Sequence, residues 1–116
     1  MDWKDVTESF TEKQRNYNGK YLEISEVYDD IIEVSLFSAK EDLYEIYISY
    51  GIMYGIIYVE KEKAYSLREE IKKIFAEEYK INKEPTGDFI DDFCKKYKVC
   101  LPNDIFFNAN ALFDMF

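Results

Sequence analysis

The sequence predicts a single α+β domain: a four-stranded antiparallel meander with helices packed on one face, in the order α-β-β-β-β-α-α-α. Two observations carry this prediction. Apolar and polar residues alternate with a period of two through residues 20–59, and apolar residues recur at helical intervals before and after that stretch. The chain has 116 residues, so we expect residues 1–116 to share one hydrophobic core.

A helix is expected over residues 2–17. Its apolar residues recur at intervals of three, four and seven, and they are Trp3, Val6, Phe10 and Tyr17. Asn18-Gly19 supplies the end signal, because glycine readily adopts the left-handed conformation that closes many helices.

Four strands are expected between Lys20 and Val59. The first two form a hairpin about Asp29-Asp30, and Gly51 permits a tight reversal between the last two. Side chains that alternate along a strand point to opposite faces of the sheet. The apolar residues expected to face the helices are Leu22, Ile24, Ile32, Val34, Leu36, Ile46 and Ile48.

Three helices are expected after the sheet. Ser66 and Glu69 have the spacing of a capping box, which predicts a helix from there to about Tyr79. Residues 61–65 could belong either to the end of the strand or to an earlier start of this helix. Residues 82–87 contain Pro and Gly and predict a loop. A further helix is expected over residues 88–97, and Pro102 opens a last short one.

Composition narrows the classes of function. The chain has 24 acidic and 15 basic residues and no histidine, for a net charge of −9. Direct contact with DNA or RNA is not expected, because it needs a cationic surface. The N-terminus lacks the apolar segment of a secretory signal, and no apolar run is long enough to span a membrane, so we expect a cytoplasmic protein. Cys94 and Cys100 are expected to be reduced core thiols.

No motif identifies a catalytic, cofactor or metal site. Without histidine the chain lacks the commonest general base near neutral pH, and phosphate-binding loops and nucleophile elbows are absent. Glu70-Ile71-Lys72 matches a short element of metal-dependent nucleases, but it falls on an amphipathic helix and is interpreted as surface charge. We therefore expect no enzyme activity, no cofactor and no metal.

Negative charge is concentrated in the predicted sheet. Residues 21–60 hold nine acids and one base, together with seven of the 11 tyrosines. Alternation places a set of acids and tyrosines on the face away from the helices, namely Tyr21, Glu23, Glu33, Glu45 and Tyr47. The sequence thus predicts an acidic, tyrosine-bearing outer face.

Two interpretations of this face are open. Acidic strands keep a small protein soluble and discourage pairing of sheet edges. Alternatively, the face docks a cationic protein, with tyrosines as anchors and carboxylates as partners of Lys or Arg. The acids in turns do not depend on strand register. The candidate partner-binding residues are Glu23, Glu26, Asp29, Asp30, Glu33, Glu41, Asp42, Glu45, Tyr21, Tyr28 and Tyr47.

In size, acidity, α+β layout and lack of catalytic residues, the chain resembles the immunity proteins of bacterial polymorphic-toxin and contact-dependent growth inhibition systems. The resemblance is one of general profile and transfers no binding residue by position. It implies a cytosolic, non-catalytic inhibitor that occludes a toxin domain with a basic surface, most often a nuclease. It also implies a monomer in a 1:1 complex.

Other classes remain open. A secretion chaperone of the type III kind is also small, acidic and α+β, but it binds an effector segment as a homodimer. A phage-encoded inhibitor that mimics the charge of DNA would present carboxylates to a cationic site in the same way. Solution mass separates the dimeric chaperone from the monomeric inhibitor.

Overall fold

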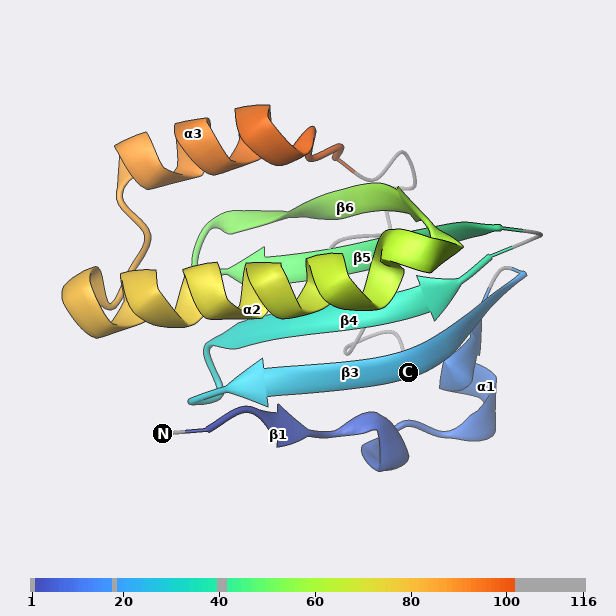
Figure 1. Cartoon of the computed structure of the whole chain (residues 1–116). Coiled ribbons are helices and arrows are strands. Elements are labelled where there is room, and N and C mark those ends of the chain that lie inside the picture. Colours follow the sequence, from blue (N-terminus) through green and yellow to red (C-terminus); the bar gives the residue numbers. More distant parts are fainter. Residues whose placement is uncertain (1, 18, 40–41, 102–116) are drawn as a thin grey trace.

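Four long antiparallel strands form the centre of the molecule (Figure 1). The structure is a computed structural model, and it describes residues 2–17, 19–39 and 42–101. Each long strand pairs with the next, which confirms the α+β class and the meander. The four strands are β3 (Lys20–Tyr28), β4 (Ile32–Ser38), β5 (Leu43–Tyr50) and β6 (Met53–Glu60).

The N-terminal segment does not form the helix expected over residues 2–17. Its elements are β1 (Lys4–Asp5), the 3-10 turn η1 (Thr7–Ser9), α1 (Glu12–Arg15) and β2 (Asn16–Tyr17). Both short strands pair with β3, so the described sheet has six strands rather than four. Trp3 packs against the core on the helix side, whereas Val6 and Phe10 pack on the opposite face. A single helical stripe cannot reach both faces, and the segment wraps the edge of the sheet instead.

Helix α2 (Lys61–Asn82) crosses one face of the sheet over β4, β5 and β6, and α3 (Gly87–Tyr97) lies beside it (Figure 1). The prediction for α3 is confirmed to within one residue. The prediction that Ser66 caps this helix is wrong, because the N-cap of α2 is Glu60, six residues earlier; residues 61–65 belong to the helix, which is one of the two alternatives left open for them. The Ser66 hydroxyl donates to the Lys63 carbonyl inside the helix, at 3.1 Å.

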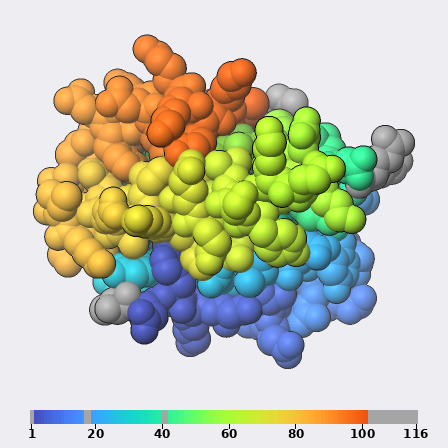
Figure 2. Space-filling view, viewed as in Figure 1, coloured from blue at the N-terminus to red at the C-terminus, as the bar shows by residue number. Residues whose placement is uncertain are grey.

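The main core lies between the sheet and the two helices. Six of the seven residues expected to face the helices pack there, and the β4 and β5 members are almost fully buried against Ile71 and Phe75 of α2. Side chains of α2 and α3 hide the middle of the sheet when the molecule is viewed from this side (Figure 2). Full burial of each isoleucine or phenylalanine contributes roughly 1.5–3 kcal/mol, so this layer dominates the stability of the fold.

Leu22 is the exception, because it faces away from the helices. The pairing of β3 with β4 shifts between Leu22 and Ile24, where a β-bulge inserts one residue and exchanges the faces of the strand. Leu22 therefore joins a second apolar cluster on the opposite face. That cluster consists of Phe10, Leu22, Phe37, Tyr47 and Ile56.

The residues after α3 return to the sheet at β6. Ile56 and Cys100 exchange two backbone hydrogen bonds of 2.8 Å in an isolated antiparallel bridge. A side chain at Gly55 would place its Cβ 2.4 Å from Val99 Cγ1, so only glycine allows this approach. Cys100 is exposed, which corrects the expectation of two core thiols, whereas burial raises the pKa of the half-buried Cys94. The short helix expected from Pro102 lies outside the described residues.

Candidate interaction surface

The residues predicted to bind a partner do not share one surface. Among those that the structure describes, Glu26, Glu45, Tyr28 and Tyr47 are buried. Glu45 and Tyr47 were expected on an accessible outer face of the sheet, and that prediction is wrong for these two residues. The remaining candidates divide between the two ends of the sheet.

Glu26 lies on the helix side of β3, opposite the core residue Val34, and is 9% exposed. Its carboxylate accepts a hydrogen bond from Arg68 and lies 2.8 Å from Lys72 Nζ. Lys72 also bonds Glu69 at 2.8 Å, and this hydrogen bond lowers the pKa of Glu69. Two cations from α2 thus neutralise Glu26, which corrects its assignment to a partner-binding surface.

Glu45 and Tyr47 do face away from the helices, but neither is accessible. The Glu45 carboxylate lies 3.0 Å from Lys20 Nζ and accepts a 3.0 Å hydrogen bond from the Tyr47 hydroxyl. The Tyr47 ring packs against Phe37, with 4.7 Å between ring centroids. A carboxylate buried in a sheet needs such partners, because burial without them would cost several kcal/mol.

Tyr28 and Glu23 are also committed to contacts within the molecule. The Tyr28 ring lies 5.3 Å from Trp3 and 5.7 Å from Tyr79, centroid to centroid. Glu23 sits at the bulge of β3, where its carboxylate accepts hydrogen bonds from Ser38 Oγ at 2.9 Å and from Tyr65 of α2 at 3.3 Å. The bulge thus turns Glu23 toward the helix side instead of the outer face.

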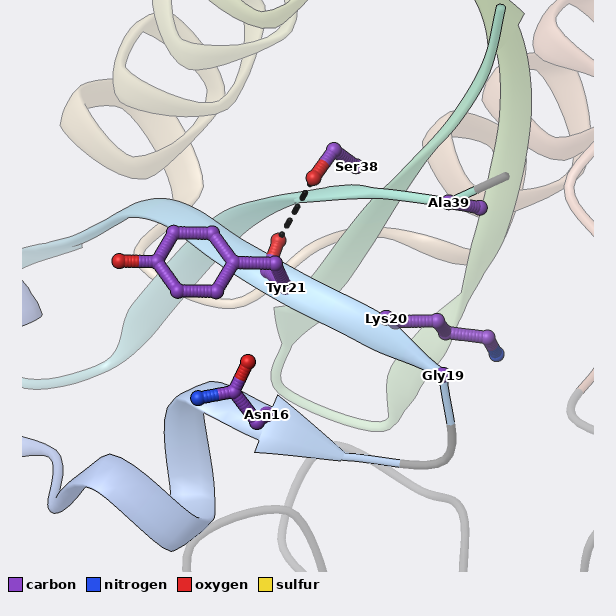
Figure 3. A pocket seen from close by; sticks show the side chains of 6 residues that line it. All are labelled: Asn16, Gly19, Lys20, Tyr21, Ser38 and Ala39. Atoms are coloured by element: carbon purple, nitrogen blue, oxygen red, sulfur yellow. Dashed lines mark hydrogen bonds between the residues drawn. The ribbon is translucent and has the colours of Figure 1, made fainter. Parts of the chain in front are cut away.

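Tyr21 lines a cavity of about 390 Å³ at one end of the sheet (Figure 3). The cavity is also lined by Asn16, Gly19, Lys20, Ser38 and Ala39. The Tyr21 ring and the Lys20 side chain point in opposite directions in Figure 3, so the polar groups do not converge on one ligand position. Asp42 is exposed and Glu33 is half-buried, while Glu41 lies outside the described residues.

Like Asp42 and Tyr21, Asp29 and Asp30 are exposed, and they form the turn between β3 and β4. Their φ angles are 53° and 56°, and Ile31 N donates to the Tyr28 carbonyl at 3.1 Å. Positive φ at both central positions is the mark of a type I′ turn, which favours Asn-Gly. The Tyr79 hydroxyl donates to the Asp29 carboxylate and fixes the turn against α2.

Two isoleucines that sequence reasoning missed lie at the same end of the molecule. Ile31 follows the Asp29-Asp30 turn and is 44% exposed, and Ile52 in the β5–β6 turn is 85% exposed. Ile52 lines a cavity of about 220 Å³ with Gly51, Glu84 and Pro85. A usable signal was present, because turn positions favour Gly, Asn, Asp and Ser over a β-branched apolar residue.

Comparison of the chain with models of protein families, with curated proteins and with solved structures gave no match. Across residues 2–17, 19–39 and 42–101, no helix has both the length and the apolar character needed to cross a membrane. In the same residues, no three Cys, Asp or Glu side chains gather in a way that could hold a metal ion.

Proposed function

We propose that this chain is a non-catalytic inhibitor, an immunity-type protein that binds and occludes a cationic bacterial toxin domain in the cytoplasm. The observation that supports the proposal is the exposed acid pair Asp29-Asp30 at the tip of the β3–β4 hairpin. The outer face of the sheet has no part in it, because its acid Glu45 is buried and paired with Lys20, although Tyr54 and Tyr58 on that face are exposed.

Apart from the hydrogen bond that Asp29 accepts from Tyr79, the acid pair is an unfavourable choice for the fold. Left-handed backbone costs a non-glycine residue roughly 1–2 kcal/mol, and two adjacent carboxylates repel each other. Asn-Gly, the pair that this turn favours most, would remove the repulsion between the carboxylates and the left-handed cost at the second position. Local choices that oppose the fold occur mainly at functional sites, so binding explains the pair better than folding does.

A fixed negative turn suits the capture of a cationic protein. The net charge of −9 attracts such a partner from a distance, and Asp29 and Asp30 add negative potential at one end of the molecule. Complementary charge raises association rates from about 10⁵–10⁶ to as much as 10⁸–10⁹ M⁻¹s⁻¹ at low salt. Inhibition would follow from occupancy of the basic cleft of the toxin, with one chain per toxin domain and no turnover.

The experiment is a capture followed by a toxicity test. The tagged full chain is expressed in its source cell, and each protein that it retains is then expressed in a second bacterium with and without the chain. We expect a basic domain that arrests growth alone and is harmless when the chain is present. Retained proteins without toxicity, or a tight dimer of the chain that holds an unfolded effector segment, would overturn the proposal.

Charge reversal locates the site. Asp29→Lys/Asp30→Lys should slow association with the captured domain about tenfold at low salt. The matched control is Asp91→Lys/Asp92→Lys, which reverses another adjacent and exposed acid pair on α3. Its association rate should change less than threefold, and equal slowing by both variants would show that only net charge matters.

A further inference from the structure

The tips of two neighbouring hairpins lie side by side at one end of the sheet. Ile32 at the start of β4 pairs with Tyr50 at the end of β5, so the 29–31 turn lies next to the two-residue turn Gly51-Ile52. Figure 1 shows both turns, the C-terminal end of α2 and the α2–α3 connection at this same end. The three segments therefore present a common surface.

This surface carries two exposed isoleucines together with three acids and one cation, Lys83, whose Nζ lies 4.6 Å from the centroid of the Tyr79 ring. Ile31 and Ile52 keep 44% and 85% of their surface exposed, although neither position requires an apolar residue for folding. Asp29 and Asp30 precede Ile31, and the exposed Glu84 shares a cavity with Ile52. We name these five residues, Asp29, Asp30, Ile31, Ile52 and Glu84, the hairpin-tip surface.

The hairpin-tip surface stands on a fixed base. The Tyr50 hydroxyl donates to the Lys83 carbonyl at 2.7 Å, which ties the β5–β6 hairpin to the end of α2. Pro85 packs against Gly51 so closely that a Cβ there would lie 3.0 Å from Pro85 Cδ. A surface already held in one shape loses little conformational entropy on binding, which favours affinity.

We propose that the hairpin-tip surface is the docking site for a cationic protein, with Ile31 and Ile52 as its apolar anchors and the three acids as its rim. The occupant is a protein surface with an apolar patch bordered by Lys or Arg, of the kind that a basic amphipathic helix presents. This inference rests on the proposed function for the biological partner, and it adds the anchors and the shape of the partner's site. Protein interfaces commonly combine a desolvated apolar centre with a polar rim.

A second copy of the chain is a poor occupant. Two hairpin-tip surfaces facing each other would bring Asp29, Asp30 and Glu84 of one copy against the same acids of the other, and like charges across an interface cost several kcal/mol. The same acids suit Lys and Arg. Charge therefore selects a cationic partner for the exposed isoleucines.

The test uses a defined probe, so that it does not depend on the toxin. The ¹⁵N-labelled full chain is titrated with a helical peptide that carries leucine on one face and lysine around it. We expect the largest amide shifts at residues 29–31, 51–52 and 84. A peptide of equal charge with the leucines replaced by serine should bind about tenfold more weakly. Largest shifts elsewhere, or equal binding of both peptides, would overturn the inference.

Variants complete the test. Ile31→Ser/Ile52→Ser should raise the Kd for the leucine peptide about tenfold, whereas Leu43→Ser should leave it within twofold. Leu43 is a matched control because it is 46% exposed and lies at the opposite end of β5. With the captured toxin domain, the isoleucine variant should speed dissociation. If Asp29→Lys/Asp30→Lys slows toxin association but the isoleucine variant leaves dissociation unchanged, the proposed function stands and this inference fails.

Discussion

Acids within the strands and acids at the hairpin tip have opposite environments, although both belong to the same acidic segment, residues 21–60. Glu26 and Glu45 lie inside strands, are at most 9% exposed, and contact Arg68, Lys72 or Lys20. Asp29 and Asp30 lie three and four residues after Glu26 along the chain and are exposed.

The difference shows how a small acidic domain separates structural charge from surface charge. A strand position fixes the direction of its side chain, so an acid there is buried once a helix or another segment covers that face, and it then needs a cation. A turn projects beyond both layers and leaves its acids in water. Net charge by segment therefore overestimates the negative surface that the sheet offers.

The largest effect is expected from Glu26→Gln. The change leaves Arg68 with only the more distant carboxylate of Glu69, at 3.9 Å, and leaves Lys72 with the same Glu69. Removal of one partner from a buried ion pair costs about 3–5 kcal/mol, and urea unfolding should show a loss of that order. Asp30→Asn, at the exposed tip, should change stability by no more than about 0.5 kcal/mol. Similar losses of stability in both variants would contradict the conclusion that strand acids support the fold and turn acids do not.

The next effect is a dependence of stability on pH. Two tyrosines packed inside the molecule have pKa values that differ from those in the unfolded chain. Burial, together with nearby carboxylates, raises the pKa of Tyr50 to about 12, and burial with a hydrogen bond to Glu70 raises that of Tyr97 to about 12. In the unfolded chain tyrosine titrates near pH 10, so the unfolded state alone loses these protons as the pH rises from about 10 to 12. The contribution of these two tyrosines to the free energy of unfolding is therefore complete below about pH 10 and is lost as the pH rises from about 10 to 12.

Urea midpoints measured from pH 9 to pH 12 check this expectation. Tyr50→Phe/Tyr97→Phe should have a lower midpoint at pH 9, because it lacks two hydrogen bonds, yet a smaller fall at high pH. A fall as steep as that of the unchanged protein would assign the alkaline transition to other groups.

The smallest effect is expected at the turn itself. Asp30→Gly removes the Cβ from a residue with φ of 56° and should raise stability by about 1 kcal/mol. It also removes one charge from the hairpin tip, so association with a cationic partner should become slower. Gain of stability with loss of binding is expected only if the acid serves recognition, and a destabilised variant would show that the carboxylate supports the fold.

The strands were predictable because their pattern is local. Alternation in Ile32–Leu36 and Tyr44–Tyr50 reflects side chains that the pleat directs to one covered face. The N-terminal segment was not, because Trp3 and Phe10 pack on different faces of a sheet that forms later in the sequence. The bulge beside Glu23 had no local signal either, since it depends on the pairing of two strands.

The candidate site was predictable only in part. Asp29 and Asp30 were found because a turn leaves them exposed in any register. The pairing of Glu26 with Arg68 joins residues 42 positions apart, and nothing near either residue indicates it. Ile52 was missed because it continues the apolar pattern of the following strand, and only its position in the turn shows that it is outside the core.

The backbone bridge between Ile56 and Cys100 limits pairing between the sheet edges of two copies of the chain. Its two hydrogen bonds occupy groups at the outer margin of β6 that a strand from another molecule would otherwise pair with. Because Gly55 alone admits Val99 so closely, any larger residue there would displace this covering segment. Gly55, which lacks a Cβ, thus helps to protect the domain against edge-to-edge polymerisation.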